Sequence, residues 1–320
     1  FGYRLLHNNN RSTLKDALIN GNTYSPNQGI IQIVIVELVQ TKTKDGVRLD
    51  GALHPPLNSP THTSPSDVLL CVHGTGGAFY TSAVFEMISQ HFSRKGMSVL
   101  RVNTRGHDSI STAATREGGR RQGAAYERVN DCRKDLTAWC HFLSHKGFTR
   151  IHLLGHSLGA VKSIYCAATE VIPQLSSVLA LSPPRLSHSW FLDRHPAFLD
   201  TYRQAERHVE GGSGRTLMEV SFPLPMLITA DGYLEKYGPD EKYNFLQYLD
   251  PIPVRMLITF GGQEIENHIA FQGLPQLLDS HRSEKNSCLD VQVIPHADHF
   301  YSQHLDPLVR VLEAWLLNED

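Results

Sequence analysis

The chain has 320 residues, 41% of them hydrophobic and 19% charged, an ordinary globular composition that is long enough to bury a large core. Its formal net charge of −2 supplies no basic field for nucleic acid or an anionic membrane surface, so we expect neither as a partner. The most apolar run, IIQIVIVELV at 30–39, is too short to cross a bilayer, so we expect no transmembrane segment.

Five cysteines are widely spaced, and no CxxC motif occurs. This spacing predicts reduced and mostly buried thiols in a reducing compartment, and a single long-range disulfide is the alternative. We expect a soluble, cytoplasmic protein, and a signal peptide removed earlier remains open.

The elements predicted in chain order begin with a polar, turn-rich extension over 1–29. The runs 30–39 and 47–54 predict an antiparallel pair of strands. Apolar runs then alternate with helical patterns, which predicts one mostly parallel sheet with helices on both faces. The predicted strands start near 68, 97, 151, 178, 254 and 289, and the predicted helices cover 82–96, 125–146, 158–169 and 305–318.

The alternation breaks between about 186 and 250, a stretch rich in aromatic residues. We predict that 186–250 is a mainly helical cap insertion, and that 30–185 and 251–320 together form the core. An ordinary run of extra core helices is the alternative.

The motif GHSLG places Ser157 between Gly155 and Gly159. A predicted strand precedes it and a small-residue helix follows it. A nucleophile on a sharp strand-to-helix turn needs small neighbours at these two positions, because strand and helix approach closely there. The pattern therefore predicts Ser157 as a nucleophile. A glycine-rich phosphate turn is the alternative, and no Walker lysine or GxGxxG motif supports it.

GHSLG, together with HGTGG at 73–77, resembles the α/β-hydrolase superfamily. The resemblance implies an α/β-hydrolase fold. It also implies two backbone N–H donors for an oxyanion, one after the third strand and one directly after the nucleophile. By position these donors are Thr75, with Gly76 as the alternative, and Leu158.

The superfamily order of nucleophile, acid and histidine implies a base after the last strand. ADHF resembles the late histidine loop of the superfamily and favours His299 over His296 and His304. Histidine suits the role because it exchanges protons near neutral pH.

The acid is expected after the strand VRMLITF, where the chain reads GGQEIEN. The resemblance favours Glu264, and Glu266 is the competitor. A carboxylate here orients the imidazole and stabilises its cation. The other position used in the superfamily, after VLALSPP, has Ser182 and prolines but no acid.

These residues predict a serine hydrolase that cleaves a small carboxylic ester through an acyl-enzyme, without a cofactor. Thioesterase, lipase, amidase or acyltransferase chemistry would use the same residues, and a non-catalytic ligand-binding protein of this fold is a further alternative. Trp190, Phe191 and His156 are predicted to line the substrate pocket. No HxH or HExxH spacing predicts a metal site.

The stretch REGGRRQGAAYERVNDCRKD, 116–135, is rich in arginine but interleaved with acids. Mixed charge of this kind is typical of a solvated face. Anion binding is the alternative.

Overall fold

The computed structural model describes residues 36–58, 66–115, 117–284 and 288–317. All described residues belong to one compact unit, which begins at Val36. The predicted extension 1–29 and the first part of the predicted strand 30–39 lie outside the described residues.

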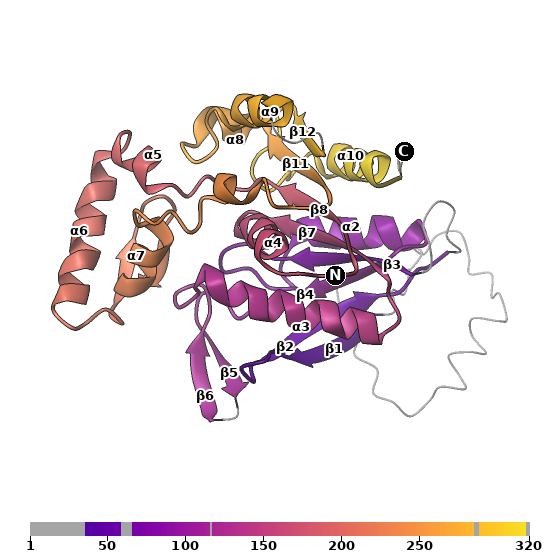
Figure 1. Ribbon diagram of the computed structural model, residues 1–320, viewed down its shortest axis with the longest axis horizontal. Coiled ribbons are helices and arrows are strands. Elements are labelled where there is room, and N and C mark those ends of the chain that lie inside the picture. Colours follow the sequence, from indigo (N-terminus) through magenta and orange to yellow (C-terminus); the bar gives the residue numbers. More distant parts are fainter. Residues whose placement is uncertain (1–35, 59–65, 116, 285–287, 318–320) are drawn as a thin grey trace, which may run out of the picture. The chain divides into compact units, whose positions relative to one another are not determined.

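An eight-stranded sheet runs through this unit (Figure 1) in the order β1-β2-β4-β3-β7-β8-β11-β12. β2 pairs antiparallel with β1 and β4, and every other neighbouring pair is parallel. The predicted mostly parallel sheet is therefore confirmed. Its strands are β1 (Glu37–Lys42), β2 (Arg48–His54), β3 (Asp67–Val72), β4 (Ser98–Val102), β7 (Arg150–His156), β8 (Leu175–Leu181), β11 (Arg255–Gly261) and β12 (Leu289–Ile294).

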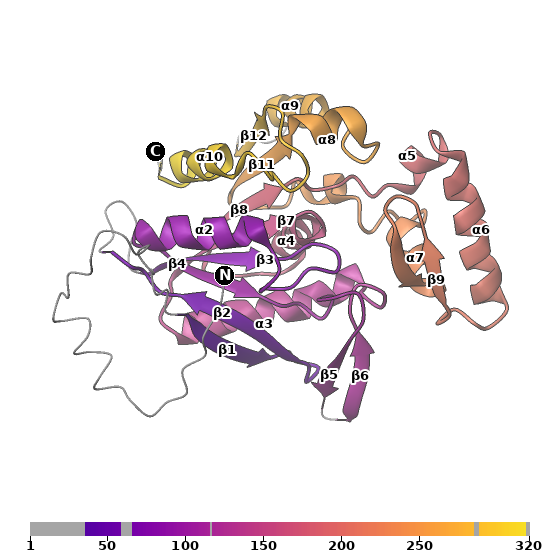
Figure 2. The ribbon, with the colours of Figure 1, turned by 180° about the vertical axis from the view of Figure 1, so that it is seen from behind.

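Helices cover both faces of this sheet (Figures 1 and 2). Side chains alternate along β3, so Leu69 and Cys71 join the cluster beneath α2 and α10, and Leu70 joins the cluster beneath α3. The covering helices are α2 (Ala83–Arg94), α3 (Cys132–His145), α4 (Leu158–Thr169), α8 (Gly262–Asn267), α9 (Leu274–Glu284) and α10 (Leu305–Leu317). Within the described ranges, no helix has the length and apolarity needed to cross a membrane.

Between β8 and β11 the chain forms a separate lobe, which we call the inserted segment (182–254; Figure 1). Its apolar residues form one cluster with residues of α4, so the segment packs on the helix that follows Ser157. Its elements are α5 (His188–Leu192), α6 (Pro196–Glu210), β9 (Leu217–Val220), β10 (Met226–Thr229), α7 (Ala230–Tyr237) and the 3-10 turn η2 (Phe245–Tyr248).

The predicted helix over 125–146 is wrong in its first part. A hairpin of β5 (Ser111–Thr115) and β6 (Gly118–Gln122) precedes it, and the 3-10 turn η1 (Val129–Asp131) leads into α3. The backbone amides of 123–125 donate to carbonyls of 105–109, so they are held by the neighbouring loop and not by a helix.

The four buried cysteines, Cys71, Cys132, Cys140 and Cys166, are all thiols. Burial raises the pKa of Cys71 and Cys140 to about 12. They therefore behave as small apolar core residues, as the sequence predicted.

His54 at the end of β2 gives the fold a specific acid sensitivity. It is 5% exposed, and burial, followed by the charge of Arg101, lowers its pKa to about 4. Between pH 6.5 and 4, His54 is protonated in the unfolded chain but stays neutral in the folded protein. The free energy of unfolding therefore falls as pH falls through this range. We expect His54→Leu to reduce this fall by up to about 1.4 kcal/mol per pH unit.

Urea unfolding at several pH values across this window measures the slope. The exposed His141→Leu is the matched control and is expected to leave the slope unchanged. Equal slopes for wild type and His54→Leu would contradict the prediction.

Candidate active site

The predicted site residues follow the carboxyl ends of neighbouring strands. Ser157 follows β7, Glu264 follows β11, and His299 follows β12, while the glycine-rich loop of 73–77 follows β3. Parallel strands end at the same edge of a sheet, so these four segments meet there.

Ser157 lies on a strained turn between β7 and α4, with a φ of 57°. A Cβ atom on Gly155 would lie 2.2 Å from the carbonyl oxygen of Gly159, and one on Gly159 would lie 2.0 Å from the carbonyl oxygen of Val72. Only glycine fits at either position. The sequence pattern therefore reflects close backbone contacts on both sides of the serine.

Ser157, His299 and Glu264 form a continuous chain of hydrogen bonds. His299 Nε2 lies 3.0 Å from Ser157 Oγ, and His299 Nδ1 lies 2.6 Å from Glu264 Oε2. The Glu264 side chain is 2% exposed and that of His299 is 27% exposed. The carboxylate is thus shielded from water while the imidazole remains accessible.

Glu264 is fixed by donors on its second oxygen. The amide of Gly261 donates to Oε1 at 2.7 Å, and the hydroxyl of Ser182 donates to the same oxygen at 2.6 Å. Both bonds stabilise the charged carboxylate in its buried position. Glu266, the competing acid, is exposed on the same helix, and the structure does not bring it to His299.

Ser182 and Tyr301 are parts of the site that the sequence reasoning did not identify. The hydroxyl of Tyr301 lies 2.8 Å from Ser182 Oγ and 2.9 Å from Thr259 Oγ1, behind the carboxylate. Burial raises the pKa of Tyr301 far above its usual range, so it stays a neutral hydroxyl. The absence of an acid at 182 was noted from the sequence, but the spacing gave no sign that a serine would support Glu264.

His299 lies on a loop held by neighbouring backbone and ring contacts. His156 donates from Nε2 to the carbonyl of His299 at 2.8 Å. Burial lowers the pKa of His156 to about 3, so its ring is neutral and serves as a fixed donor. His296 is exposed, and the amide of Leu308 donates to the carbonyl of His304 near the start of α10. The structure brings neither of them to Ser157.

The glycine-rich loop lies against Ser157. A Cβ atom on Gly74 would be 2.9 Å from Ser157 Cβ and 3.4 Å from Ser157 Oγ. The next residue is Thr75, the predicted oxyanion donor, and Gly76 has a φ of 64° that favours glycine. Leu158 is the first residue of α4, where backbone amides have no acceptor within the helix.

A buried ion pair supports this loop from below. The amide of Thr104 donates to His73 Nε2 at 3.0 Å, and His73 Nδ1 donates to the carbonyl of Gly74 at 2.8 Å. Lys162 donates to Thr104 Oγ1 at 3.0 Å and to Glu127 Oε1 at 2.9 Å. The Lys162 and Glu127 side chains are 0% and 2% exposed, so neither charge is solvated by bulk water.

We expect Lys162→Met to lower the free energy of unfolding by about 3–5 kcal/mol, because it leaves Glu127 charged and unpaired in the interior. The double variant Lys162→Met/Glu127→Gln removes that charge and is expected to recover part of the loss. Urea unfolding of both variants measures the difference. A single variant as stable as wild type would contradict the expectation.

Phe191 was predicted to line a substrate pocket, and the structure gives it packing partners. It is fully buried, and its ring contacts those of Phe198, Phe222 and Tyr237 within the inserted segment. A contact with substrate stays a prediction.

Trp190, the second predicted pocket residue, lies between two cations. The guanidinium of Arg185 lies 3.2 Å from its ring centroid and that of Arg194 lies 3.5 Å from it. Its indole N–H donates to the carbonyl of Ile269 at 2.8 Å. Trp190 therefore joins the inserted segment to the chain beyond β11, and its contact with substrate also stays a prediction.

The rings beside His299 include two phenylalanines that the sequence reasoning did not single out. The Phe271 ring centroid lies 5.3 Å from that of His299, and the Phe300 centroid lies 5.1 Å from it. Phe300 is 61% exposed, so an apolar surface borders the candidate site.

The chain belongs to the alpha/beta hydrolase family, whose sequence profile matches residues 69–314. The resemblance carried by GHSLG and HGTGG is thereby confirmed. The search of curated proteins found no match.

Solved structures share the fold at low identity. Est1E from Butyrivibrio proteoclasticus with bound ferulic acid is 17% identical, with a TM-score of 0.60 over 88% of this chain and 99% of its own. The alpha/beta hydrolase GrgF from Penicillium sp. sh18 is 15% identical, with a TM-score of 0.61 over 88% and 97%. A soluble variant of monoglyceride lipase from Saccharomyces cerevisiae is 14% identical, with a TM-score of 0.60 over 92% and 99%.

Proposed function

We propose that the protein is a serine hydrolase that cleaves a carboxylic ester through an acyl-enzyme. The observation that carries this proposal is the chain of hydrogen bonds from Ser157 Oγ through His299 to the buried carboxylate of Glu264. Membership of the alpha/beta hydrolase family and the fold shared with esterases and a lipase support it.

In the acylation step, Ser157 Oγ attacks the ester carbonyl carbon while His299 Nε2 accepts its proton. Glu264 accepts a hydrogen bond from His299 Nδ1–H, which fixes the tautomer of His299. The carboxylate also stabilises the imidazolium without taking its proton. The amides of Thr75 and Leu158, with Gly76 as the alternative, stabilise the oxyanion. The carbon–oxygen bond to the leaving alcohol then breaks, and His299 gives the proton to that alcohol.

In the deacylation step, a water molecule attacks the acyl carbon while His299 accepts its proton. The bond from the acyl carbon to Ser157 Oγ breaks, and the proton returns to Ser157. The carboxylic acid leaves, and the enzyme is regenerated without a cofactor.

The inserted segment is proposed to act as a cap over 186–250, and Trp190, Phe191 and His156 are proposed to lie along the substrate path. Phe271 and Phe300 add aromatic surface beside His299 and favour an apolar acyl group or leaving group. Thioesters, acylglycerols and amides would use the same residues, so graded ester and thioester panels distinguish these substrate classes. A cytoplasmic location stays part of this proposal, since the described cysteines are thiols.

A fluorophosphonate probe tests the proposal directly, because it reacts with activated serine hydroxyls. We expect wild type to be labelled and Ser157→Ala to remain unlabelled. Equal labelling of both proteins would mean that the probe reacts with another group and would contradict the nucleophile assignment. An unlabelled wild type would contradict it too and would favour a non-catalytic ligand-binding protein.

A further inference from the structure

A hollow beside the β5–β6 hairpin is lined by a cluster of arginines that the proposed reaction does not use. Its empty space of about 320 Å³ includes open solvent. Four arginines are among its lining residues, Arg105, Arg120, Arg121 and Arg215. Arg105 follows β4, Arg120 and Arg121 lie on β6 within the arginine-rich stretch 116–135, and Arg215 comes from the inserted segment.

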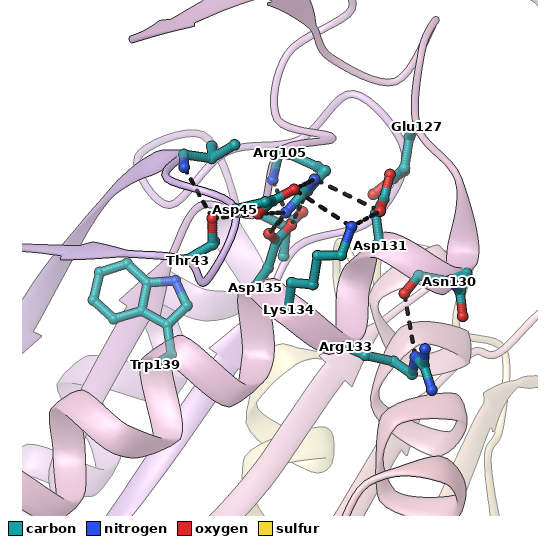
Figure 3. A network of polar contacts seen from close by, with 12 residues as sticks. Thr43, Asp45, Arg105, Glu127, Asn130, Asp131, Arg133, Lys134, Asp135 and Trp139 are labelled. Atoms are coloured by element: carbon teal, nitrogen blue, oxygen red, sulfur yellow. Dashed lines mark hydrogen bonds and ion pairs between the residues drawn. The ribbon is translucent and has the colours of Figure 1, made fainter. Parts of the chain in front are cut away.

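Arg105 is already neutralised. It makes paired hydrogen bonds with Asp45 at 2.9 and 3.0 Å, and it also bonds the fully buried Asp135 at 2.8 Å (Figure 3). These carboxylates hold Arg105 as a structural cation at the base of the loop 104–109.

The other three arginines have no acidic partner among the residues that the structure describes. Arg120 and Arg121 are exposed on β6, and the guanidinium of Arg215 lies 5.2 Å from the ring centroid of Tyr126. These three cations line the hollow without a described counter-ion, so its surface favours an anion.

Two carboxylates also line the hollow, but each is already ion-paired. Glu127 pairs with Lys162 at 2.9 Å, and Asp131 pairs with Lys134 at 2.7 Å. The lining therefore keeps a positive surplus. Glu127 Oε2 is buried without a donor in the described structure, so it can accept a bond from a ligand hydroxyl.

Gln122 supplies an independent sign of a missing ligand. Its side chain is 5% exposed and lines the hollow, yet neither Oε1 nor Nε2 has a hydrogen-bond partner among the described residues. Buried amides without partners are costly and rare, and each needs an explanation such as a bound ion or water. An oxyanion would accept from Nε2, and a ligand hydroxyl would donate to Oε1.

We propose that this hollow binds a phosphate group, either as inorganic phosphate or as the end of a small phosphate monoester. Planar guanidiniums match phosphate oxygens by forming paired hydrogen bonds, and the Gln122 amide adds a neutral donor. The protonated oxygen of a monohydrogen phosphate, or a hydroxyl of the ligand, would donate a hydrogen bond to Glu127 Oε2. The hydrogen bonds from the amides of 123–125 to the carbonyls of 105–109 connect the hollow to the loop 104–109. This loop contacts the glycine-rich loop of the candidate active site, because the amide of Asp108 donates to the carbonyl of Gly77.

Calorimetric titration at constant ionic strength tests the site with inorganic phosphate and, in a second arm, with phenyl phosphate. We expect Arg120→Ala and Arg121→Ala each to weaken phosphate binding by about tenfold or more. Arg203→Ala removes an exposed arginine from α6, outside the hollow, and serves as the matched control with an expected change below about twofold. Tighter binding of phenyl phosphate identifies a monoester as the ligand, and tighter binding of inorganic phosphate identifies the free ion.

Gln122→Met separates binding from folding. Its amide makes no hydrogen bond in the described structure, so we expect the variant to keep the wild-type melting temperature without phosphate and to bind phosphate more weakly. Equal affinities for the hollow variants and Arg203→Ala would mean an adventitious ion only and would overturn the proposal, as would no heat of binding at about 10 mM phosphate. Ser157→Ala is expected to bind phosphate like wild type, so this test is independent of the proposed hydrolase reaction.

Discussion

Replacing Ser157 with alanine is expected to lower kcat for a p-nitrophenyl ester by about 10⁶-fold, with a much smaller effect on KM. The substitution removes the only oxygen within hydrogen-bond distance of His299 Nε2 in the described structure, so no acyl-enzyme forms. Remaining catalysis would come from the oxyanion donors and from substrate binding alone. Steady-state kinetics of purified protein measure the loss.

Ser163→Ala is the matched control for this substitution. Ser163 lies on α4, the helix that follows Ser157, and its hydroxyl donates to the carbonyl of Gly159 at 2.9 Å. We expect its activity to stay within about threefold of wild type, since only a local hydrogen bond is lost. If Ser157→Ala kept more than about 1% of wild-type kcat, the nucleophile would have to be another group.

The turn at Ser157 was predictable because its physical requirements are local. Gly155 and Gly159 must lack side chains where strand, helix and the end of β3 touch, and this need is visible as GxSxG between an apolar run and a helical pattern. The choice of His299 and Glu264 needed more than local pattern. It rested on the superfamily order of the segments after the last two strands, since several histidines and two glutamates compete there.

The β5–β6 hairpin was not predictable, and the reason is physical. Its second strand, GGRRQ, combines glycines with charged residues, lacks alternation of apolar and polar side chains, and is mostly exposed. The residues that follow, 123–125, are held by amides that donate to carbonyls of 105–109. Contacts between distant segments therefore delay α3 to Cys132, although the local sequence favours an earlier start.

The support of Glu264 also depends on distant segments. Ser182 follows β8, Tyr301 follows β12, and both converge behind the carboxylate that follows β11. A serine after a strand has no pattern that distinguishes it from a turn residue. Position 182 has no acid, which is why the sequence favoured Glu264 as the acid. The serine at this position instead donates a hydrogen bond that stabilises Glu264.

Replacing Glu264 with glutamine is expected to lower kcat by about 10⁴-fold while leaving the fold intact. The amide of Gly261 donates to Oε1 at 2.7 Å, so a glutamine here must turn its carbonyl oxygen toward Gly261. Its NH₂ group then faces His299 Nδ1, which becomes an acceptor. The proton moves to Nε2, and the imidazole can no longer accept the proton of Ser157.

Glu266→Gln is the matched control, with the same chemical change two residues further along α8 on an exposed side chain. We expect its kcat to stay within about threefold of wild type, because a distant exposed charge is screened by solvent. Urea unfolding of both variants separates loss of catalysis from loss of stability. The reverse outcome, with Glu266→Gln inactive and Glu264→Gln active, would mean that the histidine is oriented by Glu266 in the working enzyme, and the 2.6 Å contact between His299 and Glu264 would then have no catalytic role.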